Sequence, residues 1–214
     1  HGRWWLGYSR KSIKFQRMKI LKNIFVSILI LFFSTNNSWS MSPSEFISSL
    51  SSEASNILSS KLSEEEKISR LKEIGEQSVD IEGVGLYTLG KYRKTLNDSQ
   101  KKQYKEIFRN YFLKSFSGRL VGYTDAKIAV LSEEIKNEKY TIVYSKLIGT
   151  SERPEVKIDW RVYTKDPEKP LIRDLIIEGL SLARTQKEEF NSIIANNDGN
   201  IEALFENLNK FIEN

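Results

Sequence analysis

The stretch from residue 155 to residue 190, EVKIDWRVYTKDPEKPLIRDLIIEGLSLARTQKEEF, decides the fold of this chain. Residues 156–163 alternate between apolar and polar side chains, which is typical of a strand with one buried face. Two prolines among the charges of 165–170 cannot continue a ladder of hydrogen bonds, so the chain turns there. A second, mostly apolar run follows at 171–178, and Ser181 can cap a helix that begins just after it. The stretch therefore predicts a β-hairpin that leads directly into a helix.

The side chains of this hairpin favour one register. We expect the pairs Tyr163 with Ile172, Arg161 with Asp174, Trp160 with Leu175, Ile158 with Ile177, and Lys157 with Glu178. This pairing brings opposite charges together on one face and apolar side chains together on the other. A slip of one residue would turn every side chain toward the wrong face, so the pattern selects the register strongly. The turn at 165–170 is nevertheless long enough to permit a bulge.

Helix-like and strand-like patterns come in blocks along the rest of the chain. Apolar residues at helical spacing predict helices over 44–60, 63–74, 80–89, 99–116, 182–195 and 201–212, and alternating runs predict strands over 126–135, 140–148, 155–164 and 171–178. Helices first, four antiparallel strands next and helices last make an α+β fold rather than an alternating α/β fold. We expect the N-terminal helices to pack on a curved four-stranded sheet.

The strongest predicted helix, over 99–116, carries a broad aromatic and aliphatic stripe. Its members are Tyr104, Ile107, Phe108, Tyr111, Phe112 and Phe116. Such a stripe is often simply core, and that interpretation stays open here. A long helix against a curved antiparallel sheet also tends to leave an apolar cavity between the two layers, and such cavities bind ligands. The pattern therefore predicts either a packed core or an apolar binding cavity.

The N-terminal residues have the three parts of a secretory signal peptide. A basic start at 18–22 is followed by an apolar run at 24–33 and by the small-x-small site Ser38-Trp39-Ser40. The apolar run is shorter than the ~20 residues that a membrane-spanning helix needs. We therefore interpret 1–17 as an upstream or expression remnant, 18–40 as a signal peptide and 41–214 as a single domain. A retained membrane anchor is the alternative.

Sequencing of the exported protein from its N-terminus is expected to begin near Met41. An exported protein that still carried the apolar run 24–33 would contradict the signal-peptide interpretation.

The charge and the missing residue types exclude several function classes. The whole chain has a net charge of +5, but seven basic residues and no acidic residue precede Met41. From Met41 onward, 26 basic residues oppose 28 acidic residues, a net charge of −2. The domain therefore lacks the positive charge that binding to nucleic-acid phosphates needs. No Cys is present and the only His is His1, which excludes Cys–His and Ser–His nucleophiles and metal sites built from His or Cys. We expect no metal and no cofactor.

Carboxylates are the remaining option for catalysis. Asp159, Asp174 and Glu178 lie on the predicted hairpin, where a buried carboxylate could act as a general base. Pairing with neighbouring Lys and Arg side chains is the simpler interpretation, and a carboxylate held by Arg161 would stay ionised and engaged.

Three stretches of the sequence resemble the MlaC family, also called the toluene-tolerance family. They are VDIEGVGLYTLGKYRKTL (79–96) with the helix that follows it (98–120), VKIDWRVY (156–163), and DLIIEGLSLARTQKEEF (174–190). The last is similar to the family's Asp-Val-x-Val-Glu-Gly-Val-Ser-Leu…Phe signature and is the most specific. The chain departs from the family pattern at Arg93, where an aromatic is usual, around Pro170-Leu171, where a Trp is usual, and at Gln186-Lys187, where Tyr-Arg is usual.

The resemblance implies a periplasmic phospholipid-binding protein of the Mla lipid-transport system. It implies a carrier that holds acyl chains in an apolar cavity and shuttles lipid between an outer-membrane lipoprotein complex and an inner-membrane ABC transporter complex. We expect a monomer with no catalytic group. The residues predicted to line the cavity are Phe108, Tyr111, Phe112, Val143, Ile158, Trp160, Leu175 and Ile177. Two alternatives are a periplasmic protein-interaction module and a small enzyme that uses Asp159 or Asp174.

Overall fold

Five antiparallel strands form one open sheet in the order β1-β2-β3-β4-β5. The computed structural model describes residues 41–214, so the predictions for 1–17 and 18–40 lie outside the described residues. The strands are β1 (Ile128–Asn137), β2 (Tyr140–Leu147), β3 (Val156–Tyr163), β4 (Leu171–Ile177) and β5 (Leu180–Ser181). Four of them confirm the predicted strands. The fifth, two residues long, was not predicted because it directly follows a turn and is too short to alternate.

Six α-helices and one 3₁₀ turn accompany this sheet in the described part of the chain. They are α2 (Pro43–Ser59), α3 (Glu64–Ser78), α4 (Ile81–Thr88), η1 (Gly90–Lys94), α5 (Asp98–Leu120), α6 (Leu182–Ala195) and α7 (Ile201–Glu213). Capping boxes open α2 at Ser42, α3 at Ser63 and α5 at Asn97. The cap of α5 lies two residues before the predicted Ser99, because Asn97 Oδ1 accepts from Gln100 N at 2.8 Å. Among residues 41–214, no helix combines the length and the apolar character needed to cross a membrane.

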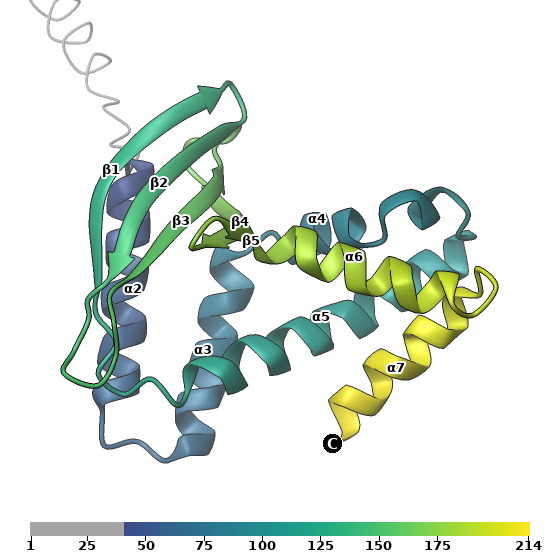
Figure 1. Cartoon of the computed structure of the whole chain (residues 1–214), viewed down its shortest axis with the longest axis horizontal. Coiled ribbons are helices and arrows are strands. Elements are labelled where there is room, and N and C mark those ends of the chain that lie inside the picture. The colour runs from purple at the N-terminus through teal and green to yellow at the C-terminus, as the bar shows by residue number, and fades with distance from the viewer. Residues whose placement is uncertain (1–40) are drawn as a thin grey trace, which may run out of the picture. The chain divides into compact units, whose positions relative to one another are not determined.

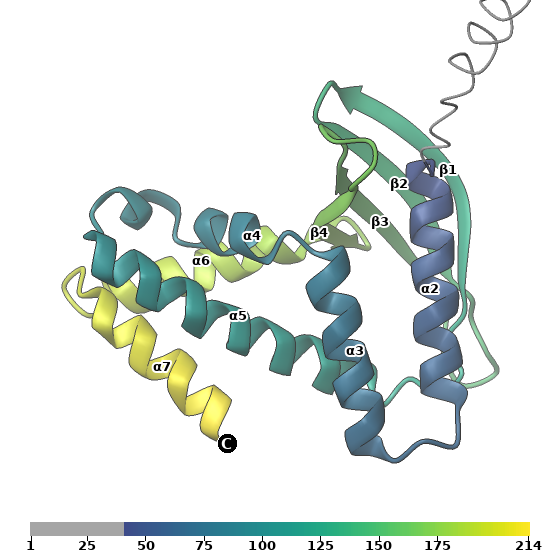
Figure 2. The same cartoon turned by 180° about the vertical axis from the view of Figure 1, so that it is seen from behind.

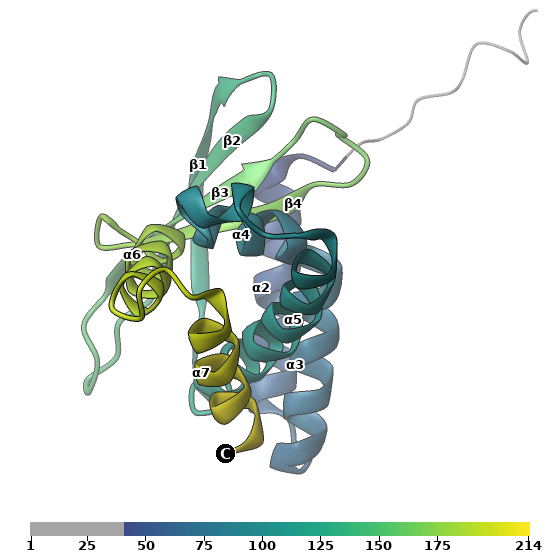
Figure 3. The ribbon, with the colours of Figure 1, turned by 90° about the vertical axis from the view of Figure 1, so that its right-hand side faces the viewer.

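The helices divide into two groups around two hydrophobic cores. Helix α2 lies along β1 and β2 (Figure 1, and from behind in Figure 2), and its Ile47 packs with Val143, Val162 and Ile172 of the sheet. Helix α5 lies between α3 and α7 (Figure 3). The second core joins α4, α5, α6 and α7. The α+β class is confirmed, with most of the helices gathered beyond one edge of the sheet.

The predicted hairpin register is confirmed over most of its length. Arg161 pairs with Asp174, Trp160 with Leu175 and Ile158 with Ile177. The predicted pair of Tyr163 with Ile172 is wrong, because a bulge shifts the register and Tyr163 pairs with Leu171 instead. The predicted Lys157–Glu178 ion pair is also replaced. The backbone N–H of Lys157 donates to Glu178 Oε1 at 2.5 Å. The ammonium of Lys157 instead lies 3.4 Å from Asp159 Oδ2.

Arg173 is the extra residue of the bulge, and it ties β4 to the junction between α3 and α4. Its Nε and Nη2 both lie 2.6 Å from Asp80 Oδ2, and its Nη1 donates to the Tyr140 hydroxyl at 2.7 Å. The guanidinium also stacks on the Tyr163 ring at 3.9 Å. Asp80 in turn caps α4 by accepting from Gly83 N at 2.9 Å. One side chain therefore connects the sheet with the start of the helical core.

Candidate functional site

The strand register places a set of apolar side chains on one face of β2 to β5. We call this set the apolar sheet face, and it consists of Val143, Ile158, Trp160, Leu175, Ile177 and Leu180. The one polar group of the Trp160 ring is satisfied within the sheet, because its Nε1–H donates to Ser145 Oγ at 2.8 Å. The Ser145 hydroxyl donates in turn to the Ile158 carbonyl at 2.8 Å. The face therefore presents an apolar surface without an unpaired indole donor.

Burial decreases across the apolar sheet face from β2 toward β5. Val143 is fully buried under α2. Ile158, Leu175 and Ile177 are only half-buried and belong to neither hydrophobic core. Leu180, on the last strand, is 59% exposed. Half-buried aliphatic side chains outside a packed core leave apolar surface available to a ligand.

The aromatic residues predicted on α5 point in more than one direction. Phe108 is buried in the helical core, with its ring edge-on to Phe190 at 6.2 Å. Tyr111 donates from its hydroxyl to Gln186 Oε1 at 2.9 Å. Burial raises the pKa of the Tyr111 hydroxyl, so it stays protonated and can keep donating to α6. Phe108 thus faces α4 and α6, and Tyr111 faces α6 and α7.

Phe112 is half-buried, as Tyr111 is, and its ring contacts the rings of both Phe108 and Phe116. It stacks on Phe116 with ring centroids 5.7 Å apart, and Phe116 approaches the backbone of α3 at Gly75. No ring contact joins an α5 aromatic with Trp160 in the part of the chain that the structure describes. The eight predicted residues therefore fall into two groups, and an enclosed cavity shared by both groups stays a prediction.

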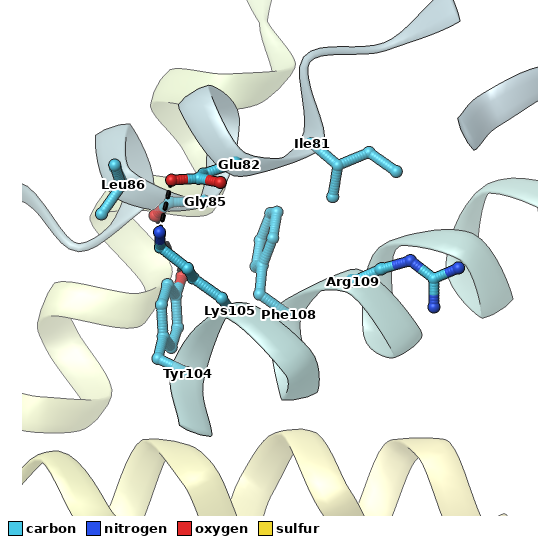
Figure 4. Close-up of a pocket in the computed structure, with 8 residues that line it drawn as sticks. All are labelled: Ile81, Glu82, Gly85, Leu86, Tyr104, Lys105, Phe108 and Arg109. Atoms are coloured by element: carbon cyan, nitrogen blue, oxygen red, sulfur yellow. Dashed lines mark hydrogen bonds and ion pairs between the residues drawn. The ribbon is translucent and has the colours of Figure 1, made fainter. Parts of the chain in front are cut away.

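A small pocket lies between α4 and α5 (Figure 4). Its volume is about 140 Å³, and its walls are Ile81, Glu82, Gly85, Leu86, Tyr104, Lys105, Phe108 and Arg109. Glu82 and Lys105 form an ion pair of 2.5 Å at its edge. Pockets that enclose drug-sized ligands measure about 300–1,000 Å³, so this one is too small for a whole phospholipid. Of the predicted site residues it includes only Phe108.

Close packing of α4 on α5 requires a glycine at position 85. A Cβ at Gly85 would lie 2.7 Å from the Phe108 ring. The Tyr104 hydroxyl lies 2.9 Å from Thr88 Oγ1 and donates to the Gly85 carbonyl at 3.1 Å. Burial raises the pKa of the Tyr104 hydroxyl far above its usual range, so it remains a donor at any physiological pH. The pocket wall is therefore held by packing and by neutral hydrogen bonds.

Asp174 and Glu178, two of the three carboxylates considered for catalysis, accept hydrogen bonds, whereas Asp159 is paired at one oxygen only. Asp174 accepts from the Ser181 hydroxyl at 2.6 Å and from Ala183 N at 3.0 Å, so it anchors the start of α6. The predicted partner Arg161 is more distant, at 3.9 Å. Asp159 Oδ1 is buried without a hydrogen-bond partner among residues 41–214. No group of three or more metal-ligating side chains occurs in this described part.

Comparison with known proteins assigns the chain to a family. The sequence model described as MlaC protein matches residues 48–210. The chain belongs to the MlaC family. Its matched region covers all eight predicted site residues and Leu180, and it includes the complete sheet. The expected family membership is therefore confirmed.

A solved structure with a similar fold agrees with the MlaC assignment. A phospholipid-binding protein from Ralstonia solanacearum, solved in complex with a phospholipid, matches with a TM-score of 0.65. The two sequences are 17% identical, and the match covers 78% of this chain and 94% of that one. No curated protein matches the sequence. The likeness confirms the fold of this MlaC-family chain.

Proposed function

We propose that this protein binds a phospholipid without covalent chemistry, with the acyl chains against the apolar sheet face. The observation that carries the proposal is the set of half-buried side chains, Ile158, Leu175 and Ile177, that lies outside both hydrophobic cores. The Ralstonia solanacearum protein of the same fold was solved with a phospholipid, which supports this ligand class.

The energetics of acyl chains fit this surface. Each methylene group removed from water contributes about 0.8 kcal/mol, so a carrier needs a long apolar contact rather than a polar one. The sheet offers that contact, and half-buried Phe112 on α5 is the predicted opposite wall. The other predicted lining residues, Phe108, Tyr111, Val143 and Trp160, would support this wall or the base of the sheet face. The headgroup would remain toward solvent.

We further propose that the protein carries phospholipid between two membranes. The expected signal peptide would deliver the protein to the periplasm, where it would pass phospholipid between an outer-membrane lipoprotein complex and an inner-membrane ABC transporter complex. Such a carrier needs no catalytic group. The engagement of Asp174 with Ser181 and the α6 N-terminus favours binding over catalysis.

Native mass spectrometry of the exported protein tests the proposal. We expect a mass increase that corresponds to one phospholipid, together with phospholipid in an organic extract of the same sample. Replacing Leu175 by Trp should lower the occupied fraction, because the larger side chain fills apolar surface needed by the acyl chains. Thermal denaturation of L175W controls for the fold. A wild-type protein that never acquires lipid would instead favour a protein-interaction module or a carboxylate-dependent enzyme.

A further inference from the structure

The turn between α4 and α5 carries a cluster of cations without acidic partners. Residues 83–97 contain Lys91, Arg93 and Lys94 and no Asp or Glu. All three side chains are exposed on η1. In the described part of the chain, none of the three forms an ion pair. Their charge is therefore directed at solvent.

A fourth cation joins this cluster from α6. Lys187 lies against Gly90, with its Cε 3.0 Å from the position of a Cβ on that glycine. Its ammonium lies over the Tyr87 ring at 5.2 Å, and no carboxylate pairs with it among residues 41–214. Gly90 has a φ of 56°, which places the start of η1 close to α6. Two elements distant in sequence thus contribute to one basic surface.

The acidic residues that flank the segment 83–97 in sequence are already engaged, whereas Glu188 and Glu189 beside Lys187 are exposed and form no ion pair among the described residues. Glu82 pairs with Lys105 at 2.5 Å, and Asp98 pairs with Lys101 at 3.2 Å. Residues from Met41 onward have a net charge of −2, so the cluster is a local exception to the charge of the domain. A local positive field on a weakly acidic protein orients it toward a negative surface.

Two tyrosines are interleaved with the four cations. Tyr87 is 40% exposed. Tyr92 is half-buried, packs on the helical core, and lies 5.1 Å below the ammonium of Lys91. Tyrosine rings are enriched at the level of lipid headgroups because they combine an apolar ring with a polar hydroxyl. This mixture of exposed cations and tyrosines is typical of a surface that rests on anionic lipid.

We propose that Tyr87, Lys91, Arg93, Lys94 and Lys187 form a docking surface for an anionic phospholipid bilayer. The turn between α4 and α5, which carries three of these residues, lies at the end of the described unit remote from the sheet (Figures 1 and 2). The docking surface is distinct from the apolar sheet face, so docking does not depend on lipid being bound there. Each cation close to an anionic leaflet strengthens binding by about fivefold, which gives a weak and reversible contact.

Cosedimentation of the exported protein with vesicles tests this surface. The vesicles are phosphatidylcholine alone or phosphatidylcholine mixed two to one with phosphatidylglycerol. We expect binding to the anionic vesicles only, and weaker binding as salt shortens the Debye length from about 8 Å at physiological ionic strength. The triple variant Lys91→Gln, Arg93→Gln, Lys94→Gln should bind the anionic vesicles about a hundredfold more weakly.

A second triple variant removes the same charge elsewhere. Lys61, Lys165 and Lys169 are also exposed, and their replacement by Gln lowers the net charge equally. This control should keep most of the vesicle binding, and both variants should melt near the wild-type temperature. Equal losses in the two variants, or equal binding of wild type to neutral vesicles, would overturn the proposal. So would a wild type that ignores anionic vesicles but uses these residues to bind an acidic protein.

Discussion

Replacing Arg173 by Ala is expected to lower the free energy of unfolding by about 3 kcal/mol. The substitution removes the guanidinium that contacts Asp80 and Tyr140 and stacks on Tyr163. Asp80 would then lose its charged partner while its side chain remains only 18% exposed. A carboxylate left largely out of water without its partner accounts for most of the expected loss. Because Asp80 also caps α4, the α3–α4 junction should loosen as well.

Arg109 provides the matched control for this prediction. It forms the same type of pair with Glu76, but the two side chains are 51% and 42% exposed. Solvent screens such a pair, so Arg109→Ala should cost less than about 1 kcal/mol. Arg173→Lys should recover only part of the loss in unfolding free energy. An ammonium has neither the two parallel N–H donors of a guanidinium nor its planar stacking surface. Urea denaturation with unchanged m-values measures all three. Equal losses at Arg173 and Arg109 would contradict the role of burial.

Most secondary structure could be predicted because its causes are local. Alternation between residues 156 and 163 depends only on neighbours, and so does the reciprocal pairing of Ser63 with Glu66 at the start of α3. The bulge at Arg173 could not be predicted in the same way. The extra residue, Arg173, pairs there with Asp80, which lies 93 residues away in sequence. At such positions a contact with a residue distant in sequence outweighs the local pattern. The periodicity of the sequence does not reveal such a contact.

The predicted site illustrates a second limit. Periodicity correctly placed Trp160, Leu175 and Ile177 on one face of the sheet, because side-chain direction follows from strand alternation. Periodicity could not indicate which neighbouring elements each aromatic side chain of α5 contacts. A broad aromatic stripe can serve two layers, and Phe108 is buried against α6 while Phe112 is not. That both line one acyl-chain cavity stays a prediction.

Leu180 is the residue that sequence reasoning missed. It follows the tight turn at Glu178 and Gly179, whose φ values of 48° and 82° reverse the chain into β5. Beside a turn, a single apolar residue resembles an ordinary exposed leucine. Its pairing with Ile177 is what places it on the apolar sheet face. The sequence did contain one signal for Leu180, since the family signature also has an apolar residue directly after its Glu-Gly pair.

Replacing Leu180 by Lys is expected to remove most of the bound phospholipid. In the proposed complex, position 180 lies where acyl chains leave the half-buried part of the apolar sheet face. A lysine in hydrocarbon costs about 2.5–3.5 kcal/mol, which corresponds to about a hundredfold loss of affinity. Because Leu180 is 59% exposed, the same substitution should change the unfolding free energy little. Native mass spectrometry gives the occupied fraction.

Leu131→Lys separates an effect of position from an effect of charge. Leu131 is 61% exposed on β1, so the two leucines differ little in exposure and the two variants gain the same charge. Leu131 has no paired position in the register, since it forms the bulge between Val130 and Ser132. If acyl chains follow the apolar sheet face, L131K keeps its lipid and L180K loses it. Equal occupancy in the two variants would place the acyl chains elsewhere, with the helical pocket beside Phe108 as the next site to test.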